Sequence, residues 1–98
     1  MTATMNKNGN ELTVLVEGRL DTLTSPKLEE KLDAEIAGVE KLILDFEKLV
    51  YISSAGLRII AGAMEVMDKQ GELIIRNVCP AVYEIMDATG FTDFLNIE

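Results

Sequence analysis

Residues 41–60 read "KLILDFEKLVYISSAGLRII", and the fold assignment depends on this stretch. Its first part, 41–46, is a short apolar run, which is typical of a strand that is covered on both faces. A loop, "EKLVYIS" at 47–53, follows the run. Apolar residues then recur at helical spacing from about residue 54 to residue 70, and Gly71 is placed to end that helix. The stretch therefore predicts a buried strand followed by a long helix.

The sequence before this stretch predicts a hairpin and a first helix. Residues 12–17 alternate between apolar and polar side chains, which is typical of a strand, and Gly18 and Asp21 close it. The segment at 2–7 is a weaker strand candidate, joined to the first by a turn at 8–10. A helix follows over 25–38, where Ser25 can cap the first turn, Pro26 fits within it, and Gly38 is placed to end the helix.

The sequence after this stretch continues the alternation of strand and helix. It predicts a buried strand at 72–77, a helix at 80–90, and a turn with a short edge strand at 91–98. The order is β-β-α-β-α-β-α-β, and strand–helix–strand units imply right-handed parallel crossovers. We therefore expect an α/β fold in which helices pack on a small mixed β-sheet that starts with an antiparallel hairpin.

Length and charge limit the classes of partner. The chain has 98 residues, of which 48% are hydrophobic, which suits one domain with a real core. Its net charge is −8 and it has no basic cluster. Nucleic acids and anionic membrane surfaces both attract positive charge, so we expect neither to be a partner.

The residues usually needed for catalysis are missing. The chain has no histidine, which excludes a Ser-His-Asp or Cys-His site and any His-ligated metal. No pair of carboxylates lies within an apolar run, and Cys79 is the only cysteine, so no internal disulfide can form. We expect a protein that is not an enzyme, with no cofactor and no metal. The absence of an apolar leader or membrane span predicts a cytoplasmic location.

The helix predicted at 54–70 has more apolar surface than one packed face requires. A core stripe is formed by Leu57, Ile60, Ala61, Met64 and Met67, and a narrow polar stripe by Arg58, Gly62, Glu65 and Lys69. The remaining flank, Ile59, Ala63 and Val66, is apolar too, although a helix that packs on one side needs only one apolar face. Two interpretations stay open: neighbouring helices cover this flank, or it is a docking surface for another protein.

The adjacent serines Ser53 and Ser54 lie where a strand-like segment meets this helix. The simplest interpretation is a helix N-cap, at which serine is a preferred residue. A hydrolase nucleophile is a poor alternative, because no Gly-x-Ser-x-Gly motif and no histidine base are present. A third interpretation is a serine that accepts a phosphate, since free backbone N–H groups and the helix dipole stabilise an anion at a helix start.

Three segments carry a family resemblance when they are taken together and in order. They are "VEGRLDTLTSPKLEEKL" at 16–32, "KLILDFEKLVYISSAGLRII" at 41–60, and "GELIIRNVCPAVYEIMDATGFTDFLNI" at 71–97. This arrangement resembles the STAS domains of bacterial anti-sigma factor antagonists over nearly the whole chain. The resemblance implies a single STAS domain at residues 1–98.

The resemblance also implies which residues carry the function. When Gly56 and Leu57 are aligned with the family's Asp-Ser-(Ser/Thr/Ala)-Gly loop, Ser54 falls at the phosphorylated serine and Ala55 at the variable position. Ser53 then stands where the family often has aspartate. Asp21 matches an acidic residue that lies near the phosphorylation site and the partner surface, although a turn-forming aspartate explains it equally well.

The implied activity is a binding switch. The unphosphorylated protein, a monomer when free, would bind an anti-sigma factor that is also a serine kinase, and a sigma factor would be released. Phosphorylation of Ser54 would block binding, and a phosphatase would reverse it. The implied partner surface comprises Asp21, Ser53, Ser54, Ala55, Gly56, Ile59, Ala63 and Val66. A different role with the same fold is a non-phosphorylated accessory subunit of a transporter or a larger signalling complex.

Overall fold

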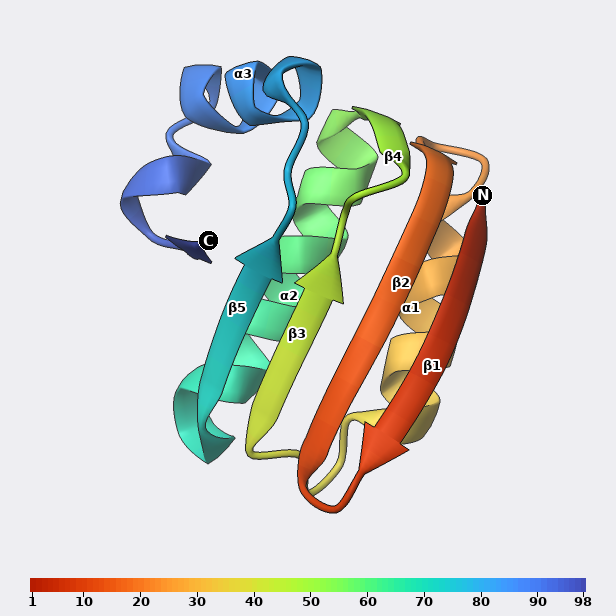
Figure 1. The fold of residues 1–98 in the computed structure, drawn as a ribbon, viewed down its shortest axis with the longest axis vertical. Helices are drawn as coiled ribbons and strands as arrows, with labels where there is room; N and C mark the ends of the chain where they lie inside the picture. Colours follow the sequence, from red (N-terminus) through yellow and green to blue (C-terminus); the bar gives the residue numbers. More distant parts are fainter.

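The computed structural model describes residues 1–98 and contains a six-stranded mixed sheet with three α-helices (Figure 1). The expected α/β fold is confirmed. In chain order the elements are β1 Thr2–Asn8, β2 Glu11–Leu20, α1 Ser25–Glu35, β3 Lys41–Asp45, β4 Leu49–Ile52, α2 Ser54–Gln70, β5 Glu72–Arg76, α3 Pro80–Ala88, the short 3-10 helix η1 Phe91–Asp93, and β6 Asn96–Ile97.

The strands of the sheet lie in the order β1-β2-β3-β5-β6, and β4 pairs separately with β2. β1 and β2 form the predicted antiparallel hairpin, whereas β2–β3, β3–β5 and β5–β6 are parallel pairs. The carboxyl ends of β2, β3 and β5 therefore meet at one end of the sheet, where α2 begins (Figure 1). Both strand–helix–strand connections place their helix behind the sheet in this view, so α1 and α2 share one face.

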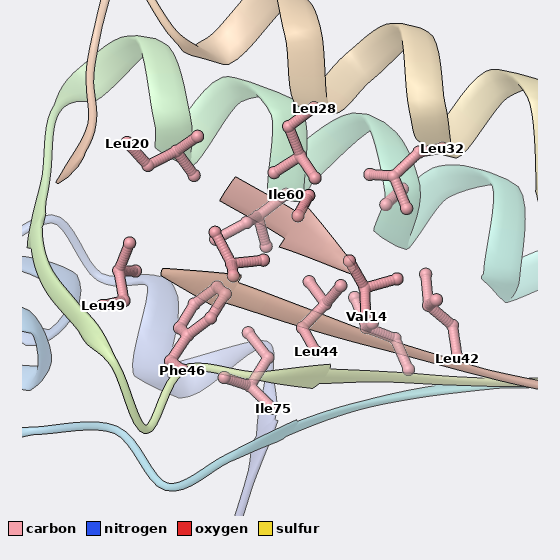
Figure 2. Close-up of a cluster of buried hydrophobic side chains, with 14 of the residues drawn as sticks. Val14, Leu20, Leu28, Leu32, Leu42, Leu44, Phe46, Leu49, Ile60 and Ile75 are labelled. Carbon is pink, nitrogen blue, oxygen red and sulfur yellow. The ribbon is translucent and has the colours of Figure 1, made fainter. Parts of the chain in front are cut away.

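One face of the sheet and the two long helices enclose the main core (Figure 2). Val14, Leu44 and Ile75 project from neighbouring strands, and Leu28 and Leu32 project toward them from α1. All of these side chains are buried. Because full burial of a leucine or isoleucine contributes about 1.5–3 kcal/mol, this layer is the main source of stability.

The expectation that the strand at 41–46 is covered on both faces is confirmed, although the helices α1 and α2 cover only one of the two faces. Leu42, Ile43 and Leu44 are all buried, but only Leu42 and Leu44 belong to the main core cluster. Ile43 pairs in register with Ile74 of β5, which is also buried and outside that cluster. Side chains alternate between the faces of a strand, so these isoleucines lie on the face opposite α1 and α2.

The segment at 47–53, predicted as a loop, contains the short strand β4. It pairs in parallel with the end of β2, with Arg19 opposite Tyr51 and a register shift between Gly18 and Arg19. Gly18 has a φ of 89°, and β2 runs on to Leu20 instead of closing at this glycine. A four-residue strand with a bulge has no clear period of two, so its sequence does not distinguish it from a loop.

At two helix boundaries, the start of α1 and the end of α2, the predicted residue has a different role from the one that the sequence suggested. Thr24 occupies the cap position of α1, and Ser25 is the first helical residue, buried, with its hydroxyl donating to the Asp21 carbonyl. Gly71 follows α2 as predicted, but in an extended conformation. A Cβ atom there would lie 1.8 Å from the Glu40 carbonyl oxygen, so close approach of two backbones requires the glycine.

Gly56, in the first turn of α2, lies against the ends of β2 and β4. A Cβ at this position would come within 2.8 Å of Ile52 Cγ1, 2.9 Å of Leu20 Cγ and 3.0 Å of the Leu20 carbonyl oxygen. Leu20 and Ile52 are themselves fully buried core residues. The absence of a side chain therefore allows the start of α2 to pack directly on the sheet.

Gly56→Ala should destabilise the protein by about 1–3 kcal/mol, because the added methyl group overpacks this contact. Gly62 on the same helix is the matched control, since a Cβ there meets nothing within 4 Å. Gly62→Ala should stabilise by about 0.5–1 kcal/mol through helix propensity. Urea unfolding of both variants measures the difference, and equal effects would contradict the close-packing argument.

Candidate functional site

The candidate site is the start of α2, where the ends of β2 and β4 come together. The Ser53 N–H donates to the Leu20 carbonyl at 2.9 Å, and the Ser53 carbonyl accepts from the Leu57 N–H at 3.0 Å. These two bonds fix the entry of the helix against β2. Ser54 is the first residue of α2 and its side chain is exposed. Its hydroxyl is therefore accessible to a modifying enzyme.

Ser53 occupies the N-cap position, as expected, but its side chain does not cap the helix. The residue is extended, with φ −102° and ψ 176°, and its hydroxyl makes no hydrogen bond to the helix. Ser53 Oγ is buried without any partner. The backbone carbonyl of Ser53, by contrast, accepts a hydrogen bond from the Leu57 N–H. The earlier N–H groups, those of Ser54, Ala55 and Gly56, precede the first intrahelical bond and are free for an anion.

Asp21 organises the loop between β2 and α1. Its Oδ1 accepts hydrogen bonds from the N–H groups of Leu23 at 3.0 Å and Thr24 at 3.1 Å. The Thr24 hydroxyl in turn donates to the Arg19 carbonyl at 2.8 Å. The hydrogen bond from the Thr24 N–H is the main cause that lowers the pKa of the Asp21 carboxyl, with Arg19 contributing a smaller electrostatic effect. The turn-forming interpretation of Asp21 is therefore confirmed.

Sequence reasoning missed a charged and aromatic pair beside this loop. The Arg19 guanidinium lies over the Tyr51 ring, 4.3 Å from its centroid, and Arg19 Nε lies 4.0 Å from Asp21 Oδ2. The pair depends on the register of β2 with β4, and the sequence contains no local signal for it. Two neighbouring apolar side chains are also exposed, Leu23 at 85% and Val50 at 62%.

The apolar flank of α2 divides into buried and exposed parts. Ala63 is only 6% exposed and belongs to the core, so it offers a partner little surface of its own. Ile59 is half-buried and packs against the core, whereas Val66 is 37% exposed. Leu57, by comparison, is 3% exposed. The stripe predicted as core is also less uniform than expected, since Ala61 and Met64 are only partly buried.

The flank borders a groove between α1 and α2, which we call the α1–α2 groove. It is lined by Leu32 of α1 and Ile36 directly after that helix, by Ile59, Gly62, Ala63 and Val66 of α2, and by the carboxylates Glu29 and Asp33. A second depression, lined in part by Thr22, Ala55 and Arg58, shares Glu29 and Ile59 with it. The hollow therefore extends from the first turn of α2 along both helices.

No three His, Cys, Asp or Glu side chains are grouped so that they could hold a metal ion. None of the helices combines the length and apolar character needed to cross a bilayer. The region at the start of α2 presents an exposed serine, the free N–H groups of the first helical turn and a partly apolar surface.

Comparison of the sequence with known proteins identifies related chains. The family model described as the STAS domain matches residues 2–98. BtrV of Bordetella bronchiseptica, provisionally named an anti-sigma factor antagonist, is 34% identical over 93 residues, which cover 93% of this chain and 80% of BtrV. The anti-sigma-B factor antagonist of Bacillus subtilis is 28% identical over 94 residues, covering 95% of this chain and 86% of that protein.

Solved structures share the fold. An anti-sigma factor antagonist from Mycobacterium paratuberculosis has a TM-score of 0.89 at 25% identity, with 98% of this chain and 83% of that one covered. Bacillus SpoIIAA in its phosphorylated form has a TM-score of 0.77 at 19% identity, with coverage of 99% and 91%. A sulfate transporter family protein from Wolinella succinogenes has a TM-score of 0.78 at 19% identity, with coverage of 91% and 74%.

Asp21→Asn should reduce the acid sensitivity of the fold. Because the folded state lowers the pKa of Asp21, the carboxylate contributes stability that is present above its usual pKa of about 3.9. This contribution is lost as the pH falls through the folded-state pKa. The free energy of unfolding of the wild type should therefore fall more steeply below about pH 4 than that of the variant. Urea unfolding between neutral and acidic pH measures both slopes, and identical slopes would contradict the assignment.

Ser53→Ala should leave stability unchanged or raise it by up to about 1 kcal/mol, because it removes a buried hydroxyl without a partner. A serine that caps its helix would instead lose about 1 kcal/mol on this substitution. Thermal or urea unfolding distinguishes the two signs. A clear loss of stability would show that the hydroxyl caps α2 in solution.

Proposed function

Because the chain belongs to the STAS domain family, we propose that it is an anti-sigma factor antagonist whose binding is switched off by phosphorylation of Ser54. The unphosphorylated form binds an anti-sigma factor that is also a serine kinase, and a sigma factor is thereby released. A phosphatase restores the binding form. The names of the two curated relatives support the antagonist role.

The observation that carries the proposal is the exposed Ser54 at the start of an α-helix whose first N–H groups are free. In the kinase reaction, Ser54 Oγ attacks the γ-phosphorus of ATP, its proton passes to a base of the kinase, and ADP leaves. The product carries about 1.5–2 negative charges and three acceptor oxygens. The helix dipole and the free N–H groups stabilise this group locally, so the fold tolerates it.

The same group is unfavourable for a protein bound at this surface. A phosphate that is desolvated in an interface without a matching cation costs several kcal/mol. Since about 1.4 kcal/mol corresponds to a tenfold change in affinity, this cost is enough to end binding. The switch therefore needs no rearrangement of the fold. The similarity of the chain to SpoIIAA in its phosphorylated form is compatible with this view.

A second candidate function is an accessory domain that is not phosphorylated. The shared fold of the Wolinella succinogenes sulfate transporter family protein favours this alternative. In that role the surface at the start of α2 would bind its partner constitutively, and Ser54 would be an exposed helix residue without a switching function. The two functions differ in whether a kinase modifies Ser54.

Incubation with a serine-kinase anti-sigma factor from the same organism and ATP should add one phosphate, which mass spectrometry should place on Ser54. Ser54→Ala should abolish the modification and still bind the kinase, since the alanine adds no charge. Ser54→Asp should fold normally but bind weakly, because a carboxylate has the same sign as a phosphate with less charge. Isothermal titration calorimetry measures the affinities.

Ser53→Ala is the matched control, because it removes the neighbouring hydroxyl and should leave phosphorylation intact. Phosphate on Ser53, or a kinase that modifies neither serine, would contradict the switch at Ser54. The accessory-domain function would then be the better proposal.

A further inference from the structure

We propose that the α1–α2 groove is a second part of the docking surface and binds an aliphatic side chain of the protein partner that is flanked by lysine or arginine. This inference rests on the proposed function, since it concerns the partner of the same switch. It adds α1 to a surface that the sequence placed only on α2 and the Asp21 loop.

The groove has the shape and apolar character to take such a side chain. Leu32, Ile36 and Ala63 are buried along it, and Ile59 and Val66 keep part of their surface exposed. At Gly62 the groove is open, because a Cβ there would meet no atom within 4 Å. Filling this space with a methyl or isobutyl group would remove apolar surface of Val66 and Ile59 from water, which is favourable.

The charges along the groove determine what flanks that side chain. Glu29 and Asp33 lie one helical turn apart on α1, and neither forms an ion pair within the chain. Lys31 of the same helix lies away from them, with its Nζ donating to the Ala3 carbonyl at 2.9 Å. Arg58 lines only the neighbouring depression. The Asp33 end of the groove thus carries a carboxylate that forms no ion pair within the chain, and a cationic partner residue complements it.

The same charges disfavour two other occupants. In a dimer formed through this groove, the Glu29 and Asp33 carboxylates of both copies would approach, and each chain has a net charge of −8. An anionic membrane surface would likewise be repelled. A separate protein with basic residues is the occupant that the charges favour.

The groove is continuous with the proposed phosphorylation site. The α1–α2 groove shares the lining residues Glu29 and Ile59 with the neighbouring depression. That depression is also lined by Ala55, which directly follows Ser54. One partner can therefore contact both places, with its nucleotide site near Ser54 and a basic and aliphatic segment between α1 and α2. Contact with the groove would hold the kinase in position over the serine.

Three variants and one control test the inference. Gly62→Leu fills the open part of the groove, Val66→Glu adds a negative charge to its wall, and Asp33→Lys reverses the charge at its rim. Glu30→Lys makes the same charge change on another side of α1, where Glu30 lines a different depression with Lys27 and Lys31. The probes are the serine-kinase anti-sigma factors of the source organism, each purified and titrated separately by calorimetry.

Each groove variant should bind its anti-sigma factor at least about tenfold more weakly than the wild type, while Glu30→Lys should stay within about twofold. Higher salt should weaken the wild type more than Asp33→Lys. Replacement of the matching partner lysine or arginine by glutamate should restore binding of Asp33→Lys. Asp33 is exposed, so this variant should fold even if Gly62→Leu does not.

The possible failures are distinguishable. A wild type that binds and is phosphorylated on Ser54, with groove variants of unchanged affinity, would overturn the groove proposal alone. A wild type that binds none of the anti-sigma factors would overturn the proposed function and the groove proposal together. A concentration-dependent dimer that Gly62→Leu abolishes, measured by light scattering, would identify a second copy as the occupant and also overturn the proposal.

Discussion

The start of α2 lies so close to the sheet that no side-chain carbon fits at residue 56. A Cβ there would fall within 3.0 Å of Ile52, of the Leu20 side chain and of the Leu20 carbonyl. This contact fixes where α2 begins, and the bond from the Ser53 N–H to the Leu20 carbonyl fixes its direction. The position of Ser54, of the Asp21 loop that follows Leu20, and of the groove beside α1 all depend on this contact.

The local chemistry of the site follows from how hydrogen bonds are distributed around that contact. One carboxylate oxygen of Asp21 accepts hydrogen bonds from N–H groups of its own loop, whereas the Ser53 hydroxyl has no hydrogen-bond partner. The N–H groups of Leu23 and Thr24 in the loop therefore have partners within the loop, whereas the N–H groups in the first turn of α2 have none within the helix. Free donors at a helix start attract an anion. A phosphate on Ser54 would satisfy groups that the unmodified protein leaves to solvent.

The sequence allowed most of the fold to be predicted, because the helices are long and periodic and the strands 41–45 and 72–76 are strongly apolar. It did not reveal β4, since this strand has four residues and a bulge opposite Gly18. Nor could it show that Ala63 is core and that Val66 lies at the surface, because both residues belong to one apolar flank and only the position of α1 separates them. The stacking of Arg19 on Tyr51 likewise depends on long-range strand register.

The packed core and the proposed binding surface lie on different sides of α2. The core is closed by Leu28, Leu32 and the inward side of α2, so the outer side of α2 contributes little to folding (Figure 2). In the proposed switch, charge added at Ser54 or at the rim of the groove would therefore act on the partner without disturbing the packed layer below. A rigid helix held at residue 56 presents both places in a fixed relation. On this proposal, a partner that contacts both places would lose complementarity when Ser54 is phosphorylated, while the protein itself would keep one fold.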